Sequence, residues 1–484
     1  MATALLLALA WLVVILPMPK GVFWQSDTFW LIEIGRNILQ HHRLPTVDIY
    51  SANSLNSPWM VYQWLSEVIF ALAHNGLALK GVEIVVVVTL TYLLSVLMFR
   101  YMITEGCNPI ASFVTTVIVF HATHPEISSA RPQLFSYVCL FLLYGILDKA
   151  WKSPPDRQSL GSAVLKTAAI AIVWTNCHVS FPLGACVAGL YASSAAASAL
   201  LSKQQNAGRL LTFGLITIVF ILASMVNPYG IELWKFALHV SAVTPAHGAA
   251  AYEWRPLDWS ALGVYAAVYC LMLLSALAAW KRITTPALLL VVGLFAAGCL
   301  HARLMIYFCI VAAPAVGQAL TMAFSRHADA PTERIKAAIV EAATSRLYPV
   351  AILVLAILVA WLSPLYPGFA LPPVQAAEFL RVNPPAGNLF CSAHAGSYLI
   401  YRFRSSIKVF VDPRVDLYDP AFMDTYLKVI QGRDWEETFA KYRIAEALVP
   451  NDSPLKDLVA LSPRWKSLYR DDAFSIFVKT DKSP

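Results

Sequence analysis

A chain of 484 residues is long enough for about three soluble domains, but its composition excludes that class of protein. Hydrophobic residues make up 58% of the chain and charged residues only 13%, whereas about 25% of the residues in a typical soluble domain are charged. The net charge of +7 comes from basic residues in separated short segments, which excludes a single basic patch for nucleic acid.

Long apolar segments predict a polytopic α-helical membrane protein. Residues 167–202, 210–231, 261–280 and 304–325 contain no Asp, Glu, Lys or Arg, and about 20 apolar residues cross a bilayer as a helix. We expect eleven transmembrane helices, at 3–18, 82–99, 109–121, 133–147, 164–176, 181–200, 210–226, 261–279, 285–300, 304–324 and 347–363. The first segment lacks a basic start and a small-x-small cleavage site, so we expect a retained helix rather than a signal peptide.

The basic residues predict how these helices are oriented. With a cytoplasmic N-terminus, the inner loops and the helix ends beside them carry 13 of the 21 Lys and Arg residues of segment 1–366, as the positive-inside rule requires. An odd number of spans then delivers the C-terminal part to the outer side. Ten of the eleven histidines also fall at or near the outer face, so we expect the chemistry there.

Two domains are expected, with the boundary at residue 366. Residues 1–366 form the transmembrane domain, whereas residues 367–484 carry 15 basic and 14 acidic residues, a density typical of soluble proteins. Strand-like and helix-like runs alternate in this second part, which favours a small outer α/β domain. We expect strands at 388–392, 408–412, 446–450, 467–471 and 474–479, and helices at 374–382, 395–403, 421–431, 434–442 and 454–462.

The first outer segment, about 19–81, contains two amphipathic helices by its pattern, at 24–40 and 61–74. Their tryptophans suit the headgroup level of a membrane, so we expect both helices to lie along the interface. Asp27 has two interpretations: an N-cap of the first helix, or a carboxylate at the water–lipid boundary that takes a proton from a hydroxyl or binds a cation. Asp48 lies in RLPTVDIYS and is interpreted as a turn residue or as a polar residue of a pocket at the outer face.

The other outer loops supply polar residues for a pocket at the outer face. Arg131 starts a span, where its donors suit either a phosphate or the lipid headgroups. His121, His124 and Glu126 lie close in sequence but lack the HExxH spacing of a helical metal site. His178 is interpreted as a packing residue or as part of the pocket. The further candidates are Asn176, Lys235, Glu253, Arg255, His301 and Arg303.

The outer domain has its densest group of charges in VFVDPRVDLYDP, just after a predicted strand. Asp412 and Arg414 are interpreted either as a structural Asp–Arg turn or as a loop that binds the acceptor or docks a domain. No glycine-rich phosphate loop or nucleophile elbow accompanies them.

The segments SDTFWLIEIGRNIL, ARPQLFSY, WTNCHVSFPLG, NPYG, EWRP, HAR and VFVDPRVDLY resemble those of the bacterial GT-C superfamily of membrane glycosyltransferases, in an uncharacterised branch. The plan is similar to that of protein O-mannosyltransferases and of the aminoarabinose transferase of lipid A. Asp27 matches the family's leading catalytic aspartate in its D-E-x-x-Y segment. Thr28 replaces the second acidic residue, and Phe29 or Trp30 stands where the tyrosine would be.

This resemblance implies transfer of a hexose or pentose from a polyprenyl-phosphate donor to an acceptor glycan, lipid or protein. The reaction would take place at the outer face of the bacterial inner membrane, with the C-terminal domain in the periplasm. Asp27 would act as the base in an inverting transfer, and Arg131, Arg303 and Arg255 would bind the donor phosphate. A divalent cation, Mg²⁺ or Mn²⁺, with Asp27 as a ligand, would fit the same role.

Two other classes stay open from the sequence. A transporter or lipid flippase would carry polar residues at mid-membrane and show repeated halves, and neither feature is evident in the sequence. A catalytically silent scaffold for envelope assembly is the third class, because Thr28 replaces the second acidic residue.

Overall fold

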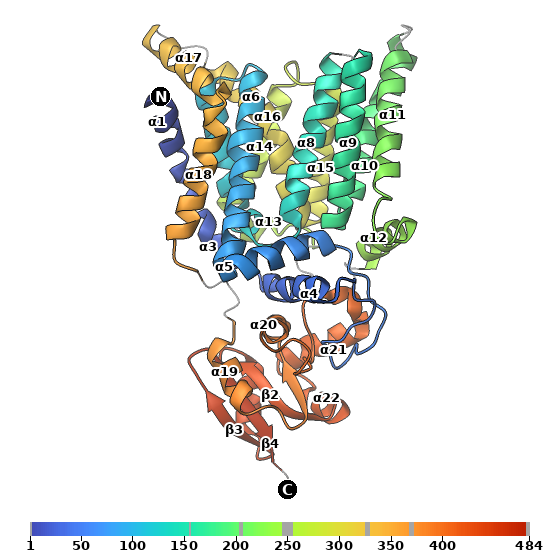
Figure 1. Ribbon diagram of the computed structural model, residues 1–484, viewed down its shortest axis with the longest axis vertical. Helices are drawn as coiled ribbons and strands as arrows, with labels where there is room; N and C mark the ends of the chain where they lie inside the picture. Colours follow the sequence, from blue (N-terminus) through green and yellow to red (C-terminus); the bar gives the residue numbers. More distant parts are fainter. Residues whose placement is uncertain are drawn as a thin grey trace. The chain divides into compact units, whose positions relative to one another are not determined.

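The computed structural model describes residues 2–153, 156–202, 207–243, 255–324, 330–366 and 372–480. The chain folds into two compact units (Figure 1). The first unit contains Met1–Val22, Leu77–Ala237 and Glu253–Tyr366, and the second contains Phe23–Gly76, Leu238–Tyr252 and Pro367–Pro484. The segment that includes Asp27 and Asp48 therefore packs with the C-terminal part of the chain.

The first unit is a helical bundle. Its elements are α1 (Ala2–Ala10), α2 (Leu12–Ile15), α3 (Met18–Val22), the later part of α5 (Trp64–Thr91), the π-helical turn η1 (Tyr92–Met98), α6 (Phe99–Thr104), α7 (Pro109–Thr123), η2 (Glu126–Ser128), α8 (Gln133–Lys152), α9 (Arg157–Cys177), α10 (Pro182–Ser202), α11 (Ala207–Ala223), the start of α12 (Ile231–Val243), α13 (Trp259–Leu262), α14 (Val264–Ala278), α15 (Thr285–Leu300), η4 (Ala302–Leu304), α16 (Met305–Phe324), α17 (Ala330–Thr344) and α18 (Leu347–Leu362). The backbone of α5 leaves the helical conformation at Leu77 and Ala78, which is where the chain passes from one unit to the other.

The expected apolar segments all coincide with helical structure in the described residues. Among the described residues, five helices are long and apolar enough to cross a membrane, and the number rises to seven if each of two bent helix pairs is one span. Four shorter apolar helices account for the other predicted spans: Pro109–Thr123, Gly208–Ala223, Val264–Ala278 and Thr285–Leu300. The prediction of a polytopic helical membrane protein is confirmed.

The outer surface of the bundle is apolar where a soluble protein would be polar. Along α11 the exposed side chains include Leu211, Leu215, Ile218 and Leu222, spaced by three or four residues as one face of a helix requires. An exposed apolar stripe of this kind is stable in a bilayer, because the side chains contact lipid tails and no apolar surface is exposed to water.

The second unit combines helices with one small sheet. Its elements are α4 (Asp27–His41), the start of α5, α19 (Val374–Val382), β1 (Asn388–Cys391), α20 (Ala393–Phe403), η6 (Val415–Leu417), α21 (Pro420–Ile430), α22 (Trp435–Lys441), β2 (Ile444–Pro450), α23 (Pro454–Leu461), β3 (Trp465–Arg470) and β4 (Phe474–Lys479). The strand order is β1-β2-β4-β3, in which β1 and β2 are parallel and the other pairs are antiparallel. The expected α/β character of the C-terminal part is confirmed.

One predicted strand is wrong. Residues 408–412 do not join the sheet but pair with the first outer segment. The Val409 N–H donates to the Tyr50 carbonyl at 3.0 Å, and the Ala52 N–H donates to the Val409 carbonyl at 2.9 Å. The local pattern KVFVD has strand propensity, but the segment with which it pairs lies far away in the sequence.

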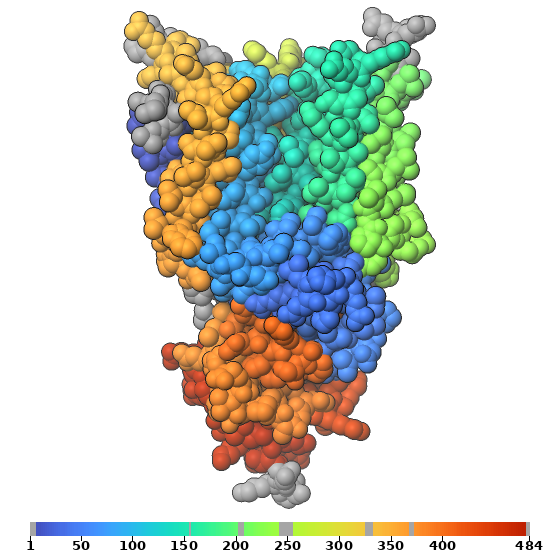
Figure 2. Space-filling view, viewed as in Figure 1, coloured from blue at the N-terminus to red at the C-terminus, as the bar shows by residue number. Residues whose placement is uncertain are grey.

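Helix α4 packs directly on α20 within the second unit (Figure 1). The Ser397 hydroxyl donates to the Ser26 carbonyl at 2.5 Å and accepts from the Trp30 N–H at 3.3 Å. Gly35 permits the close approach of α4 to α5, because a Cβ at this position would lie 2.0 Å from the Glu67 carbonyl oxygen. Figure 2 shows the surface of the first outer segment, in blue, against that of the C-terminal part, in orange.

Candidate active site

Asp27 is the first residue of α4 and is half-buried. The N-cap position belongs to Ser26, whose hydroxyl makes no capping bond and instead hydrogen-bonds His394 Nδ1 at 2.8 Å. Burial lowers the pKa of His394, and the negative charge of Asp27 opposes that shift. The carboxylate of Asp27 therefore lies within electrostatic reach of a neutral imidazole from α20, and the capping interpretation loses its support.

Two arginines from different parts of the chain lie near His178 in the first unit. Arg131 stands two residues before α8, and Arg303 is in the turn η4 before α16. Burial lowers the pKa of His178 well below its usual range, and the positive charges of Arg303 and Arg131 lower it further. The side-chain amide of Gln133 faces the Arg303 guanidinium. These groups form a cationic cluster, which we define as Arg131, Arg303, Gln133 and His178.

A chain of hydroxyls holds His178 in place. Its Nδ1 accepts from the Ser180 backbone N–H at 3.2 Å and lies 3.0 Å from the Ser136 hydroxyl. The Tyr307 hydroxyl donates to Ser180 Oγ at 3.3 Å. Because Nδ1 is an acceptor here, the imidazole is neutral with its proton on Nε2. The neutral ring therefore adds no positive charge to the two guanidiniums, and it offers a donor to an anion.

The His-rich outer loop does not assemble a metal site. His124 lies just after α7, 3.1 Å from the Ser128 hydroxyl through Nδ1, while His121 is exposed and Glu126 begins η2. Burial and then the charges of His121 and Lys20 lower the pKa of His124 to about 4. Across the described ranges, no three His, Cys, Asp or Glu side chains are arranged to hold a metal ion.

The remaining outer-loop candidates are dispersed in the first unit. Asn176 donates to the carbonyls of Ile172 and Val226, which is a structural role. Lys235 is exposed and pairs with Glu232 at 2.6 Å. The Arg255 carbonyl accepts from the Ala302 N–H at 3.0 Å, so Arg255 lies beside the turn that holds His301 and Arg303. Glu253 lies outside the described residues.

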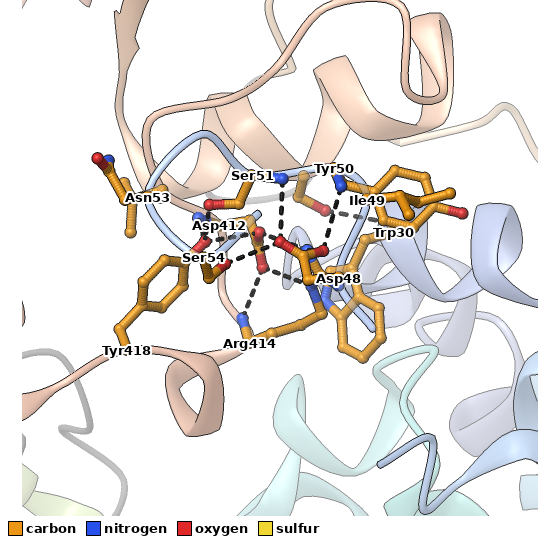
Figure 3. A network of polar contacts seen from close by, with 12 residues as sticks. Trp30, Asp48, Ile49, Tyr50, Ser51, Asn53, Ser54, Asp412, Arg414 and Tyr418 are labelled. Carbon is orange, nitrogen blue, oxygen red and sulfur yellow. Dashed lines mark hydrogen bonds and ion pairs between the residues drawn. The ribbon is translucent and has the colours of Figure 1, made fainter. Parts of the chain in front are cut away.

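Asp48 and Asp412 share the guanidinium of Arg414 in the second unit (Figure 3). Arg414 Nη2 lies 2.9 Å from Asp48 Oδ1 and 2.8 Å from Asp412 Oδ2, and all three side chains are fully buried. The Tyr418 hydroxyl donates to Asp412 Oδ2 at 2.8 Å and lies 3.0 Å from the Ser51 hydroxyl. Asp48 does form the expected turn, since it accepts from the N–H groups of Tyr50 and Ser51, but it also anchors the C-terminal part.

Aromatic rings surround this buried cation. The guanidinium carbon of Arg414 lies 4.6 Å from the ring centre of Trp59 and 5.4 Å from that of Tyr50. Burial alone would raise the pKa of Asp412, but the charge and hydrogen bonds of Arg414 outweigh it and hold that pKa below its usual range. The ion pairs of Arg414 with Asp48 and Asp412 join two segments of the second unit. Because all three side chains are buried, an acceptor in solution does not contact them.

Sequence reasoning missed several residues that the fold brings to these groups. His394 joins Asp27, and Gln133 and Ser136 join the cationic cluster. Gln133 and Ser136 stand in the segment ARPQLFSY, three residues apart, so they share a helix face, which was the available signal. His394 stands in a helical segment that carries no motif, and nothing in the linear sequence connects it with Asp27.

Solved structures with similar folds were found. The archaeal oligosaccharyltransferase AglB from Archaeoglobus fulgidus, in complex with an inhibitory peptide and a dolichol-phosphate, superposes with a TM-score of 0.58 at 12% identity, covering 93% of this chain and 69% of that one. The apo oligosaccharyltransferase of the same organism gives a TM-score of 0.57 at 11% identity, with the same coverage. ArnT from Cupriavidus metallidurans, bound to undecaprenyl phosphate, gives 0.52 at 13% identity, covering 99% of this chain and 97% of that one.

The chain thus shares its fold with these oligosaccharyltransferases and with ArnT, as the resemblance in its sequence predicted. No protein-family model and no curated protein sequence matches it. The similarity to ArnT extends over nearly the full length of both chains, so the C-terminal part belongs to the shared architecture.

Proposed function

We propose that this protein transfers a sugar from a polyprenyl-phosphate-linked donor to an acceptor hydroxyl at the outer face of the bacterial inner membrane. The observation that carries the proposal is the cationic cluster: two guanidiniums, one just before α8 and one in the turn η4, near a neutral imidazole, in a fold shared with ArnT. AglB and ArnT were solved with dolichol-phosphate and undecaprenyl phosphate respectively. In this chain we expect a prenyl phosphate to bind the cationic cluster, because arginine binds phosphate oxygens through two parallel donors.

The proposed reaction inverts the anomeric carbon in one displacement. The acceptor oxygen forms a bond to that carbon while the bond from the carbon to the phosphate oxygen breaks, and the phosphate leaves with the electron pair. Arg131 and Arg303 stabilise the negative charge that develops on the phosphate. Asp27 takes the proton of the acceptor hydroxyl as general base, and Arg255, beside the turn that holds Arg303, adds positive charge.

Thr28 stands where the family that the sequence resembles carries a second acidic residue, and among the described residues no three His, Cys, Asp or Glu side chains are grouped to hold a metal ion. The leaving group is stabilised by guanidiniums in this scheme, and the acceptor is activated by a carboxylate.

Arg131→Ala is expected to weaken binding of polyprenyl phosphate by about 10- to 150-fold, because it removes one charge-assisted contact of roughly 1.5–3 kcal/mol. The measurement is titration of the purified full chain in nanodiscs with polyprenyl monophosphate. Arg282→Ala, which removes an exposed arginine, is the matched control and should bind as the parent does. Equal binding by both variants would remove Arg131 from the donor site.

The proposed orientation is tested separately from the chemistry. A reporter enzyme that is active only outside the cytoplasm, fused after Pro484, is expected to be active, because the basic loops favour the cytoplasmic side. A second fusion, in the inner loop near Arg157, should be inactive. Activity of a cytoplasm-only reporter after Pro484 would reverse the orientation and place the proposed site on the wrong face.

A further inference from the structure

A solvent-open pocket of about 580 Å³ lies within the second unit, apart from the groups described above. It is formed by the second half of α4, the segment of α5 before its bend, and the end of α20. Its lining residues are Arg36, Leu39, Gln40, Asn75, Tyr401, Arg402 and Arg404. The volume is in the range of pockets that hold small ligands, about 300–1,000 Å³, and three of the seven lining side chains are arginines.

Arg36 is fixed in position at this pocket. Its Nη2 donates to His74 Nδ1 at 2.9 Å, and its guanidinium carbon lies 4.9 Å from the ring centre of Tyr401. Because arginine only donates, Nδ1 must be an acceptor, so His74 is neutral and its Nε2 donates to the Tyr401 hydroxyl at 2.8 Å. Neither the neutral ring of His74 nor the ring of Tyr401 offsets the positive charge of Arg36. The Arg36 side chain is 17% exposed.

The pocket keeps an excess of positive charge. Glu33 lies 3.5 Å from Arg36 and 3.9 Å from Arg404, and the Arg404 distance is too long for a hydrogen bond. Arg402 pairs with Glu378 at 2.5 Å, but this pair is about 40% exposed on each side, where ion pairs contribute little. Three guanidiniums thus face two carboxylates, and one of those, Glu33, is only 3% exposed.

Arg404 lines this pocket from the C-cap of α20. Its φ is +57°, which a non-glycine residue seldom adopts. With 58% of its side chain exposed, the Arg404 guanidinium is accessible to a ligand from solution.

We propose that this pocket binds the phosphate or carboxylate group of an anionic saccharide, which would make such a saccharide the acceptor of the transfer reaction. The assignment of an acceptor rests on the proposed function, whereas the binding itself does not. Arg36, Arg402 and Arg404 suit the oxyanion, because a guanidinium forms parallel bonds to two of its oxygens. The amides of Gln40 and Asn75 suit sugar hydroxyls, because each amide both donates and accepts.

The test is equilibrium binding by the full chain in phosphatidylcholine nanodiscs, with glucose 1-phosphate and glucuronate as probes. Both are expected to bind more tightly than glucose, and glucose 1-phosphate more tightly than inorganic phosphate. Arg404→Gln and Arg402→Gln are each expected to weaken binding about tenfold or more, since each removes a charge-assisted contact. Arg381→Gln is the matched control: Arg381 bonds the same Glu378 but does not line the pocket.

Several results would overturn the proposal. Equal loss in Arg381→Gln would mean that Glu378, not the pocket, governs binding. Equal binding of inorganic phosphate and glucose 1-phosphate would show an oxyanion site without sugar recognition. Competition by phosphatidylglycerol, introduced into the nanodiscs, would assign the site to a lipid headgroup. Failure of all probes to bind would reject the pocket but leave sugar transfer intact, whereas lost transfer with normal probe binding would reject the proposed function alone.

Discussion

Asp27→Asn is expected to reduce glycosyl transfer by about 10²–10⁴-fold, the usual contribution of a general base. The change removes the proton acceptor while keeping the size and shape of the side chain. Its cost to folding should be small, because Asp27 is not the N-cap of α4 and a carboxylate in a first helical turn contributes only about 0.3–1 kcal/mol. The measurement is product formation by purified variants in nanodiscs at saturating donor.

Asp419→Asn is the matched control for this substitution. Asp419 is exposed and caps α21 through the Ala421 N–H, and asparagine caps about as well as aspartate. Full activity is expected in this variant. If Asp27→Asn were as active as Asp419→Asn, the Asp27 carboxylate would have no part in the mechanism. The interpretation of the protein as a catalytically silent scaffold would then be strengthened.

Arg414→Met is expected to destabilise the second unit by about 3–5 kcal/mol, because it leaves Asp48 and Asp412 buried without their counter-charge. The expected signature is a fall of roughly 10²- to 10³-fold or more in amide hydrogen-exchange protection at residues 47–59 and 408–418. Arg433→Met removes an exposed arginine from the same unit and should stay within about 0.5 kcal/mol of the parent.

A substitution in one of the carboxylate partners of Arg414 tests the same ion pairs. Asp48→Asn is expected to weaken the same contact, which a residue that only forms a turn would not do. Unchanged protection in Arg414→Met would mean that the aromatic rings around the guanidinium, and not the ion pairs, hold the two segments together.

Hydropathy and charge were sufficient to predict the membrane architecture. Uncharged runs such as 167–202 have one stable solution in a bilayer, since each backbone group must be paired inside its own helix. The alternation of patterns after residue 366 likewise predicted an α/β domain, because strand and helix periodicities differ.

Contacts between distant segments could not be predicted. Arg414 pairs with Asp48 and Val409 pairs with Tyr50, although some 360 residues separate the partners. A single sequence carries no signal for such pairs. The strand propensity of 408–412 was therefore read as a strand of the C-terminal domain, whereas Val409 pairs with the first outer segment. The pocket around Arg36 could not be predicted for the same reason, because its residues come from α4, α5 and α20.

Some residues of the candidate site could be predicted from their position at the end of a predicted span. Arg131, Arg303 and His178 were selected because each stands at the outer end of an apolar run, and the fold brings the two arginines within electrostatic reach of the imidazole. Asp27 was selected by its place after the first span. Its convergence with the arginines stays a prediction, as does the donor that they would share.

The most direct test of glycosyl transfer is donor consumption by the purified protein. The full chain in nanodiscs is incubated with lipid-linked sugars extracted from bacterial membranes, together with a cell-envelope extract as the source of acceptor. Mass spectrometry then follows each lipid species. The account predicts that one polyprenyl-phosphate sugar disappears, that free polyprenyl phosphate appears in equal amount, and that Asp27→Asn shows neither change. Unchanged lipid-linked sugars with the parent protein, or equal consumption by Asp27→Asn, would contradict it.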